Sequence, residues 1–193
     1  MKLDAKTERM TKAERERRIA AIELRRTAFH EASHYVVISR LRGLAQVDIW
    51  RNSRANVARG EAAWRGLCLM MAPAGSLPVE IGGMSAAQIE QRRRFVLETI
   101  PADWNAIYGL AGLVGEAMAV DEAVDEDVVG HIQAAIECDE VSATDLEALG
   151  DWTEEQVFRT VDLLREQWPE VERVAADAMR QAQGRSSPGP RGK

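Results

Sequence analysis

Most apolar residues of this chain recur at helical spacing, beginning with its first segment. Residues 1–43 contain no proline and are rich in Ala, Glu, Arg and Leu, a composition that favours one long helix. Thr11 or Lys12 can begin this helix, and Gly43 is a natural place for it to end. Apolar side chains predict one buried stripe toward its C-terminal half: Ile19, Ile22, Phe29, Val36, Val37 and Leu41.

The periodicity changes after this helix. Residues 45–50 alternate apolar and polar side chains, which predicts a short strand. The connection at 52–60 has the composition of turns, and residues 60–73 can hold one or two further strands. Two prolines and three glycines in residues 73–85 predict a loop.

The remaining segments are helical in pattern. Ser85 can cap a helix that ends before Pro101. Residues 103–124 are apolar nearly all round and rich in small side chains, so we expect a buried helix that its neighbours approach closely. Further helical stretches follow at residues 125–141, 142–151 and 152–183, the last broken near Pro169. The predicted fold class is therefore mainly α (α+β), with a small sheet directly after the first helix.

Composition at the two ends divides the chain into three parts. Residues 1–18 are highly charged and are expected to form an N-terminal extension. Residues 184–193 have the composition of a disordered tail. We expect a single domain over residues 19–183, which is long enough to bury a core.

Charge and cysteine usage exclude several function classes. Hydrophobic residues make up 46% and charged residues 29% of the chain, as in soluble globular proteins. The net charge of −6 argues against nucleic-acid binding, and no apolar run approaches the ~20 residues that span a bilayer. Cys68 and Cys138 have no metal-type spacing. No signal peptide is visible, so we expect reduced thiols in a cytoplasmic protein.

Candidate chemistry centres on the segment FHEASHYVV, at residues 29–37. His30 and His34 are four positions apart, so both imidazoles can face one Zn²⁺ ion from a single side of a helix. Glu31 would lie near a zinc-bound water, whose proton its carboxylate could take during attack on an amide. The alternative is an ordinary amphipathic helix that carries a Glu–His pair.

A catalytic zinc site needs a third protein ligand. The metzincin arrangement is excluded, because Arg40 occupies the position six residues after His34. Two distant carboxylates remain. Glu116 lies on the predicted buried helix, and Asp145 follows Ser142 in a pattern that resembles a capping box. Local sequence leaves both open, because Asp145 could simply be a helix-start acid, and Glu116 could simply face solvent or form an ion pair.

Five segments, in the right order, resemble the FtsH-type peptidases, the proteolytic domain of membrane-bound ATP-dependent zinc proteases. FHEASHYVV is similar to the HEAGHAVV zinc helix of that HEXXH family, and VDIW with GEAAW is similar to its two following strands. LAGLVGEAMAVDEAV is similar to the LLGGRAAEEL helix, and SATDLEAL to the GASNDLxxAT segment. Residues 157–179 resemble the closing helices, so the resemblance covers most of residues 25–180.

The resemblance implies roles residue by residue. His30, His34 and Asp145 would be the zinc ligands, Glu31 the general base, and Glu116 a helix residue near the site. It also implies a helical metallopeptidase domain. The sequence has no phosphate-binding loop, ATPase module or transmembrane segment, so we expect a stand-alone peptidase domain and not a complete ATP-driven protease.

Three functions follow as expectations. The first is a zinc-dependent metalloendopeptidase that hydrolyses peptides or flexible protein segments, with Glu31 activating a zinc-bound water and without ATP. The second is a zinc-binding but non-proteolytic interaction domain, and the third is a metal-free helical binding module. Glu31 beside two histidines favours the first over the second, because a purely structural zinc site has no use for that carboxylate.

The expected partner is a peptide or protein substrate, which the sheet edge near residues 47–50 would bind as an added strand. Tyr35 and His131 are candidate transition-state donors, although structural roles explain them as well. We expect no nucleic acid and no membrane, while a separate ATPase partner stays open. The charged N-terminus and the acidic run at 121–127 argue for a monomer or small oligomer and against a stable hexamer.

Overall fold

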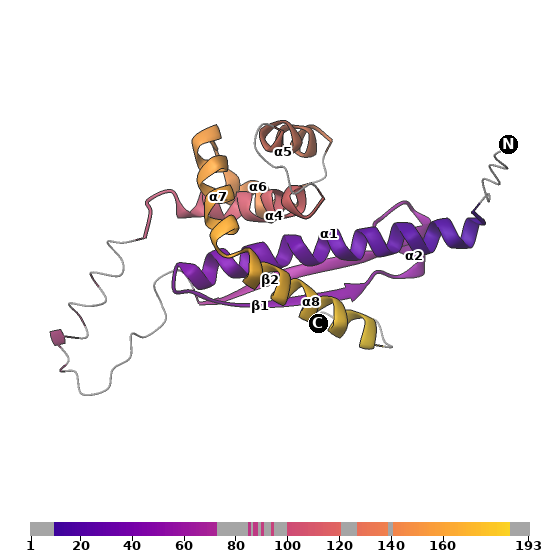
Figure 1. Ribbon diagram of the computed structural model, residues 1–193, viewed down its shortest axis with the longest axis horizontal. Coiled ribbons are helices and arrows are strands. Elements are labelled where there is room, and N and C mark those ends of the chain that lie inside the picture. Colours follow the sequence, from indigo (N-terminus) through magenta and orange to yellow (C-terminus); the bar gives the residue numbers. More distant parts are fainter. Residues whose placement is uncertain are drawn as a thin grey trace, which may run out of the picture.

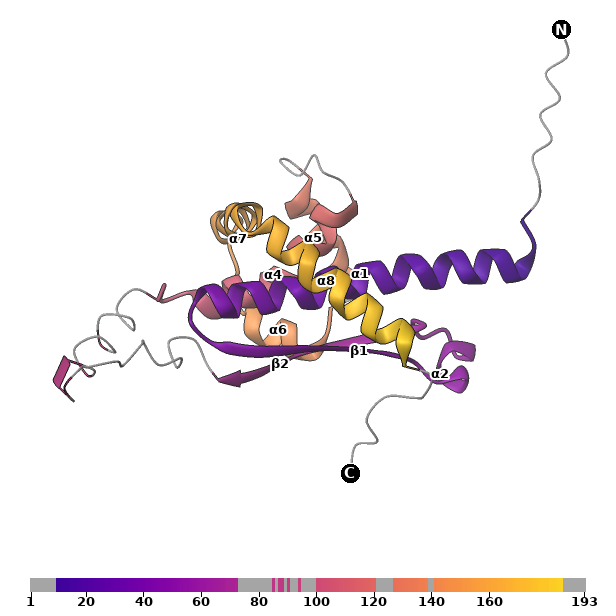
Figure 2. The same cartoon turned by 60° about the horizontal axis from the view of Figure 1, so that its bottom comes forward.

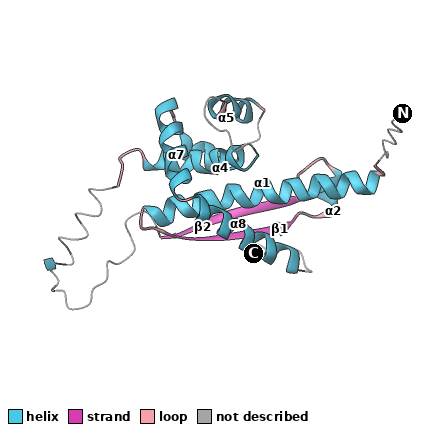
Figure 3. Cartoon of the chain, viewed as in Figure 1, coloured by secondary structure: helices cyan, strands magenta, loops and turns pink. Residues whose placement is uncertain are grey.

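The computed structural model describes residues 10–72, 100–120, 127–138 and 141–185, with single positions at 85, 87, 88, 90 and 94. In this part of the chain the fold is mainly helical and contains one two-stranded antiparallel sheet, which confirms the predicted fold class (Figure 3). The predicted loop, most of the helix after Ser85, the acidic run at 121–126 and the tail at 186–193 lie outside the described residues.

The first helix, α1 (Lys12–Arg40), begins and ends as predicted. Thr11 is its N-cap: the Thr11 hydroxyl accepts from the Glu14 N–H at 3.3 Å, while the Glu14 carboxylate accepts from the Thr11 N–H at 2.7 Å. Gly43 follows the last turn and donates its N–H to the Ile38 carbonyl at 2.8 Å. A Cβ at residue 43 would lie 2.6 Å from the Ile38 side chain, so this turn requires glycine.

The buried stripe predicted for α1 is correct only in its C-terminal half. Phe29, Val36 and Val37 are buried, and Leu41 is half-buried. Ile19 and Ile22 are 55% and 52% exposed, so for these two the prediction is wrong. The N-terminal part of α1, which includes residues 12–18, projects past the other described helices (Figure 1), and Ile19 and Ile22 are exposed there. A helical period in the sequence identifies which face of a helix packs against the core, but not how far along the helix that packing extends.

Strands β1 (Leu44–Arg51) and β2 (Trp64–Ala72) form the antiparallel hairpin that follows α1. Their register places Val47 opposite Cys68 and Ile49 opposite Gly66. The connection between them contains a short helix, α2 (Arg54–Ala58), where we expected turns alone. Ser53 nucleates this helix as an N-cap. The hairpin lies along one side of α1 and forms an outer layer (Figure 2).

Five described helices follow the hairpin, at the positions that the sequence predicts. They are α4 (Trp104–Val120), α5 (Val128–Glu137), α6 (Ala143–Leu149), α7 (Glu154–Glu166) and α8 (Trp168–Gly184). Pro169 lies in the first turn of α8, which explains the break between the last two helices. Helix α4 packs against α1, α5, α6 and α7, and α8 packs against α1 and β1. No helix in the described ranges is long and apolar enough to cross a bilayer.

Glycines on α4 allow both α1 and α6 to approach its backbone. A Cβ at Gly109 would lie 2.6 Å from the backbone nitrogen of Leu149, in α6. Cβ atoms at Gly112 and Gly115 would overlap the His30 ring and the Ser33 side chain of α1. The expectation of a buried helix with close neighbours is therefore confirmed, and α4 is the element on which α1 and α6 are positioned.

Substitution of Gly109 by Ala should destabilise the fold, because the new methyl group meets backbone atoms of Leu149 that no rotamer change can move. We expect a loss of about 1–3 kcal/mol in the free energy of unfolding, measured by urea denaturation. The matched control is Gly130→Ala in α5, where the nearest atom lies at 3.6 Å. Helix propensity predicts that this control gains about 0.5–1 kcal/mol. Equal stability of the two variants would contradict the close α4–α6 contact.

Candidate metal centre

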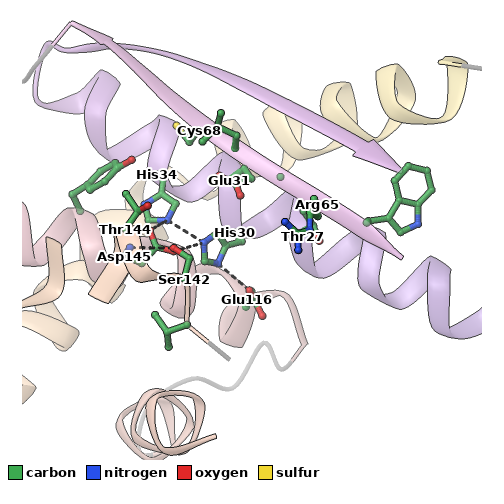
Figure 4. Close-up of a pocket in the computed structure, with 15 residues that line it drawn as sticks. Thr27, His30, Glu31, His34, Arg65, Cys68, Glu116, Ser142, Thr144 and Asp145 are labelled. Atoms are coloured by element: carbon green, nitrogen blue, oxygen red, sulfur yellow. Dashed lines mark hydrogen bonds and ion pairs between the residues drawn. The ribbon is translucent and has the colours of Figure 1, made fainter. Parts of the chain in front are cut away.

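The side chains of His30 and His34, from α1, and of Asp145, from α6, lie close enough together to share one metal ion. The two Nε2 atoms are 3.1 Å apart, and the Asp145 carboxylate oxygens lie 3.3 Å from His30 Nε2 and 3.4 Å from His34 Nε2. These three side chains line a cleft of about 470 Å³ whose walls come from α1, β2, α4 and α6 (Figure 4). The three residues that the resemblance implies as ligands are therefore brought together by the fold.

This triangle of donor atoms fits a tetrahedral metal ion. Ligand atoms about 2.0–2.1 Å from a tetrahedral ion are separated by about 3.3–3.4 Å. The two imidazole nitrogens are 3.1 Å apart, and each has a different Asp145 oxygen near that distance, Oδ2 at 3.3 Å from His30 Nε2 and Oδ1 at 3.4 Å from His34 Nε2. With one ligand atom taken from each residue, the three atoms lie within 4.8 Å of one another. Two imidazole nitrogens and one carboxylate are also a common ligand set for zinc. The residues present therefore fit a divalent metal in both spacing and chemistry.

Glu116 holds His30 from the side opposite Asp145 (Figure 4). Its carboxylate accepts from His30 Nδ1 at 2.9 Å and is in turn bound by the Arg26 guanidinium at 2.8 Å. This contact fixes the ring orientation and leaves Nε2 facing the other donors. Glu116 therefore contacts His30 from outside the group of His30, His34 and Asp145, whose donor atoms are close enough to share an ion.

Asp145 is oriented by the residue that caps its own helix. Ser142 Oγ donates to Asp145 Oδ2 at 2.7 Å, and the Asp145 N–H donates to Ser142 Oγ at 3.1 Å. The predicted helix-start role and the predicted ligand role thus belong to the same residue. Because the cap and the carboxylate are linked, the start of α6 sets the direction of the Asp145 carboxylate.

His34 is held by packing instead of by a second hydrogen bond. It is 2% exposed, and its Nδ1 is buried with no partner among the described residues. Its ring packs against the Tyr108 ring with centroids 4.6 Å apart. The two histidines therefore differ: the orientation of His30 is set by a carboxylate, that of His34 by an aromatic side chain.

Burial and charge shift the pKa values of the acidic groups and of His30. Burial by itself raises the pKa of Glu116, but the hydrogen bond from His30 and the charge of Arg26 outweigh it and lower the value to about 2. The pKa of Asp145 is likewise held below its usual range by His30 and His34 against the effect of burial. Burial lowers the pKa of His30, yet bonds to Asp145 and Glu116 raise it well above its usual value.

Glu31 lies beside the cluster and not in it. Its side chain packs under β2, where a Cβ at Gly66 would lie 2.6 Å from Glu31 Oε1. Glu31 is 8% exposed, and burial raises its pKa although His30 and His34 pull it down. A carboxylate with a raised pKa, on the same cleft as the three donors, is suited to exchange protons with a bound water.

The lining of the cleft bears on three of the candidates named from the sequence. Its sheet wall is residues 64–68 of β2, which faces α1 at Glu31, whereas residues 47–50, where we expected a substrate strand to add, lie on β1 and do not line it. Tyr35 and His131 do not line it either, since Tyr35 packs against the core and His131 is exposed on α5, which agrees with the structural roles considered for them.

Sequence reasoning also missed Tyr108, which does line the cleft. Burial raises its pKa, with further contributions from Cys68, Asp145 and Glu31. A signal for Tyr108 exists in the sequence, because it precedes Gly112 and Glu116 by four and eight residues, on one face of α4.

No family model and no curated protein matches this chain. The resemblance to FtsH-type peptidases thus rests on the order of the quoted motifs, and the geometry of the cleft is independent of it. The functional argument is therefore made from the residues of the site.

Asp145→Ala should abolish tight zinc binding, whereas Glu116→Gln should weaken it about 10- to 100-fold, because it removes an orienting charge and not a ligand. Competition with a chromophoric chelator measures both affinities. Asp151→Ala, an exposed aspartate just after α6, is the control and should bind zinc normally. If Glu116→Gln lost the metal while Asp145→Ala kept it, the assignment of the third ligand would be wrong.

Zinc affinity should fall as the pH falls. A histidine must be neutral to bind a metal, and the raised pKa of His30 means that a proton competes with the ion at neutral pH. For one displaced proton, affinity drops about tenfold per pH unit below that pKa. Titration with a competing chelator from about pH 6 to pH 8.5 measures this slope around the ordinary histidine value of about 6.5. A zinc affinity that does not change with pH over this range would contradict the raised pKa of His30.

Proposed function

We propose that this protein is a zinc-dependent metalloendopeptidase that hydrolyses peptides or flexible protein segments. The observation that carries the proposal is the triangle of His30, His34 and Asp145 on an open cleft, with the Glu31 carboxyl group beside it. The resemblance to FtsH-type peptidases supports the same conclusion, because it assigns the same four residues to the same roles. Two free cysteines, Cys68 and Cys138, suit a reducing compartment, so we propose a cytoplasmic location.

The number of protein donors favours a catalytic over a structural metal site. Structural zinc sites have four protein ligands, whereas catalytic sites have three and an open position. Among the described residues, the group of His, Cys, Asp and Glu side chains close enough to share an ion contains three members. Cys68 lines the same cleft without joining that group. Three donors on an accessible cleft are what hydrolysis requires.

Different residues of the chain would have different roles in peptide hydrolysis. A zinc ion, when bound, would polarise the scissile carbonyl and make the attacking water more acidic. Glu31 would take the proton of that water and later pass it to the leaving nitrogen. Burial of Glu31 raises its pKa, which makes the carboxyl group a better proton donor in the second step. Glu116 and Ser142 would keep the ligands in place throughout.

The cleft suits an extended substrate. One wall is β2, whose residues 64–68 run along it, and the strand pairs with β1 in a sheet of two strands. A peptide lying beside β2 could pair with its backbone while its carbonyl group faces Glu31. Such a substrate must be unfolded over several residues, so we propose peptides and flexible segments as substrates.

Glu31→Gln should leave zinc content and fold unchanged and lower hydrolysis about 100- to 10,000-fold, because an amide cannot accept the proton of water. Cleavage of fluorescently labelled casein, with zinc measured by atomic absorption, tests this. Glu172→Gln, an exposed glutamate on α8, is the matched control and should cleave at the parental rate. Zinc-loaded parental protein that cleaves no faster than the Glu31→Gln variant would favour the alternative, a non-proteolytic zinc-binding domain.

A further inference from the structure

The cleft contains a hydroxyl group that the proposed mechanism does not use. Tyr108 lines it together with His30, Glu31, His34 and Asp145. Among the described residues, the Tyr108 hydroxyl has no hydrogen-bond partner. Half-buried tyrosines usually place this group against a partner. A donor on this cleft that has no partner among the described residues is available to a ligand.

Packing fixes the position of Tyr108. Helix α4 runs antiparallel to α1, since His30 contacts Gly112 and Glu116 while His34 contacts Tyr108. Leu110 and Ala111, on the same stretch of α4, are completely buried in the core. The Tyr108 ring packs on the His34 ring at 4.6 Å and 43°. Tyr108 therefore lines the cleft beside His34, whereas Glu116 contacts His30.

We propose that Tyr108 is a catalytic residue of this site, whose hydroxyl donates a hydrogen bond to the oxygen of the scissile carbonyl as that oxygen becomes negatively charged. The inference rests on the proposed function and names a further group that touches the reacting atoms. Donors placed where charge develops are among the largest contributions to catalysis of acyl transfer.

The step balances without a further reactant. The oxygen of water bonds to the carbonyl carbon while Glu31 takes one of its protons, and the C=O π electrons move to the carbonyl oxygen. Tyr108 donates its hydrogen bond to this oxygen. The electron pair then reforms the C=O bond as the C–N bond breaks, and Glu31 gives its proton to the leaving nitrogen. Tyr108 keeps its own proton, because burial raises the pKa of its hydroxyl above the ordinary phenol value of about 10.

The chain offers a matched control, because it contains two tyrosines. Tyr35 is half-buried on α1, packs against the core and does not line the cleft. Loss of either hydroxyl removes the same atom from a half-buried ring. A general effect on folding would appear in both variants, whereas a catalytic effect appears in one.

Tyr108→Phe should lower kcat for labelled casein about 100-fold, with KM changed less than about twofold and zinc content unchanged. Tyr35→Phe should cleave at the parental rate. The inference is overturned if Tyr108→Phe retains parental kcat, if the loss is in KM alone, or if Tyr35→Phe loses as much.

A binding experiment separates this inference from the proposed function. A phosphinic peptide, whose tetrahedral phosphorus stands for the addition intermediate, and a simple hydroxamate are titrated into the zinc-loaded proteins by calorimetry. Tyr108→Phe should weaken the phosphinic peptide about tenfold or more and the hydroxamate less than about twofold. Equal effects on both ligands, or no phosphinic binding to the parental protein, overturn the role of Tyr108. Absence of casein cleavage by the parental protein, with the binding difference intact, instead overturns the peptidase proposal.

Discussion

The contact between α4 and α1 sets the geometry of the whole site. Gly112 of α4 lies directly against the His30 ring, and a methyl group there would overlap it. The absence of that methyl group lets α4 come close enough for Glu116 to reach His30 Nδ1 and for Tyr108 to reach the His34 ring. One helix face thereby orients both histidines, and neither ring depends on solvent for its position.

The charges gathered around this contact explain why a cation is expected there. Glu31, Glu116 and Asp145 are largely buried, and Arg26 supplies one compensating positive charge. With both histidines neutral, the cluster carries three negative charges and one positive charge, which is costly away from water. Protons on the histidines reduce the imbalance, which is why the pKa of His30 is raised. A divalent ion removes it completely, so proton and metal compete for the same place.

What the sequence predicts well is local. The helix start at Thr11 or Lys12, the glycine stop at Gly43 and the i, i+4 histidines each follow from residues within one or two turns, and the structure contains all three. Asp145, the third member of the group that could hold an ion, lies 115 residues from His30, and no local pattern separates it from Glu116. Only the packing of α6 and α4 decides between them. The exposed Ile19 and Ile22 show the same limit, because the length of the covering layer is a tertiary property.

Helix α6, which positions Asp145, is the shortest helix that contributes to the site. It has seven residues, a length that is marginal for an isolated helix, and it is held through Leu149 against Gly109 and through its Ser142 cap. Asp145 depends on both contacts, whereas the histidines lie on a helix of 29 residues. An ion bound by all three side chains would join α6 to α1 directly. Binding of the ion would therefore mainly stabilise α6, the shortest helix of the site. Loss of the ion should loosen α6 before it loosens α1.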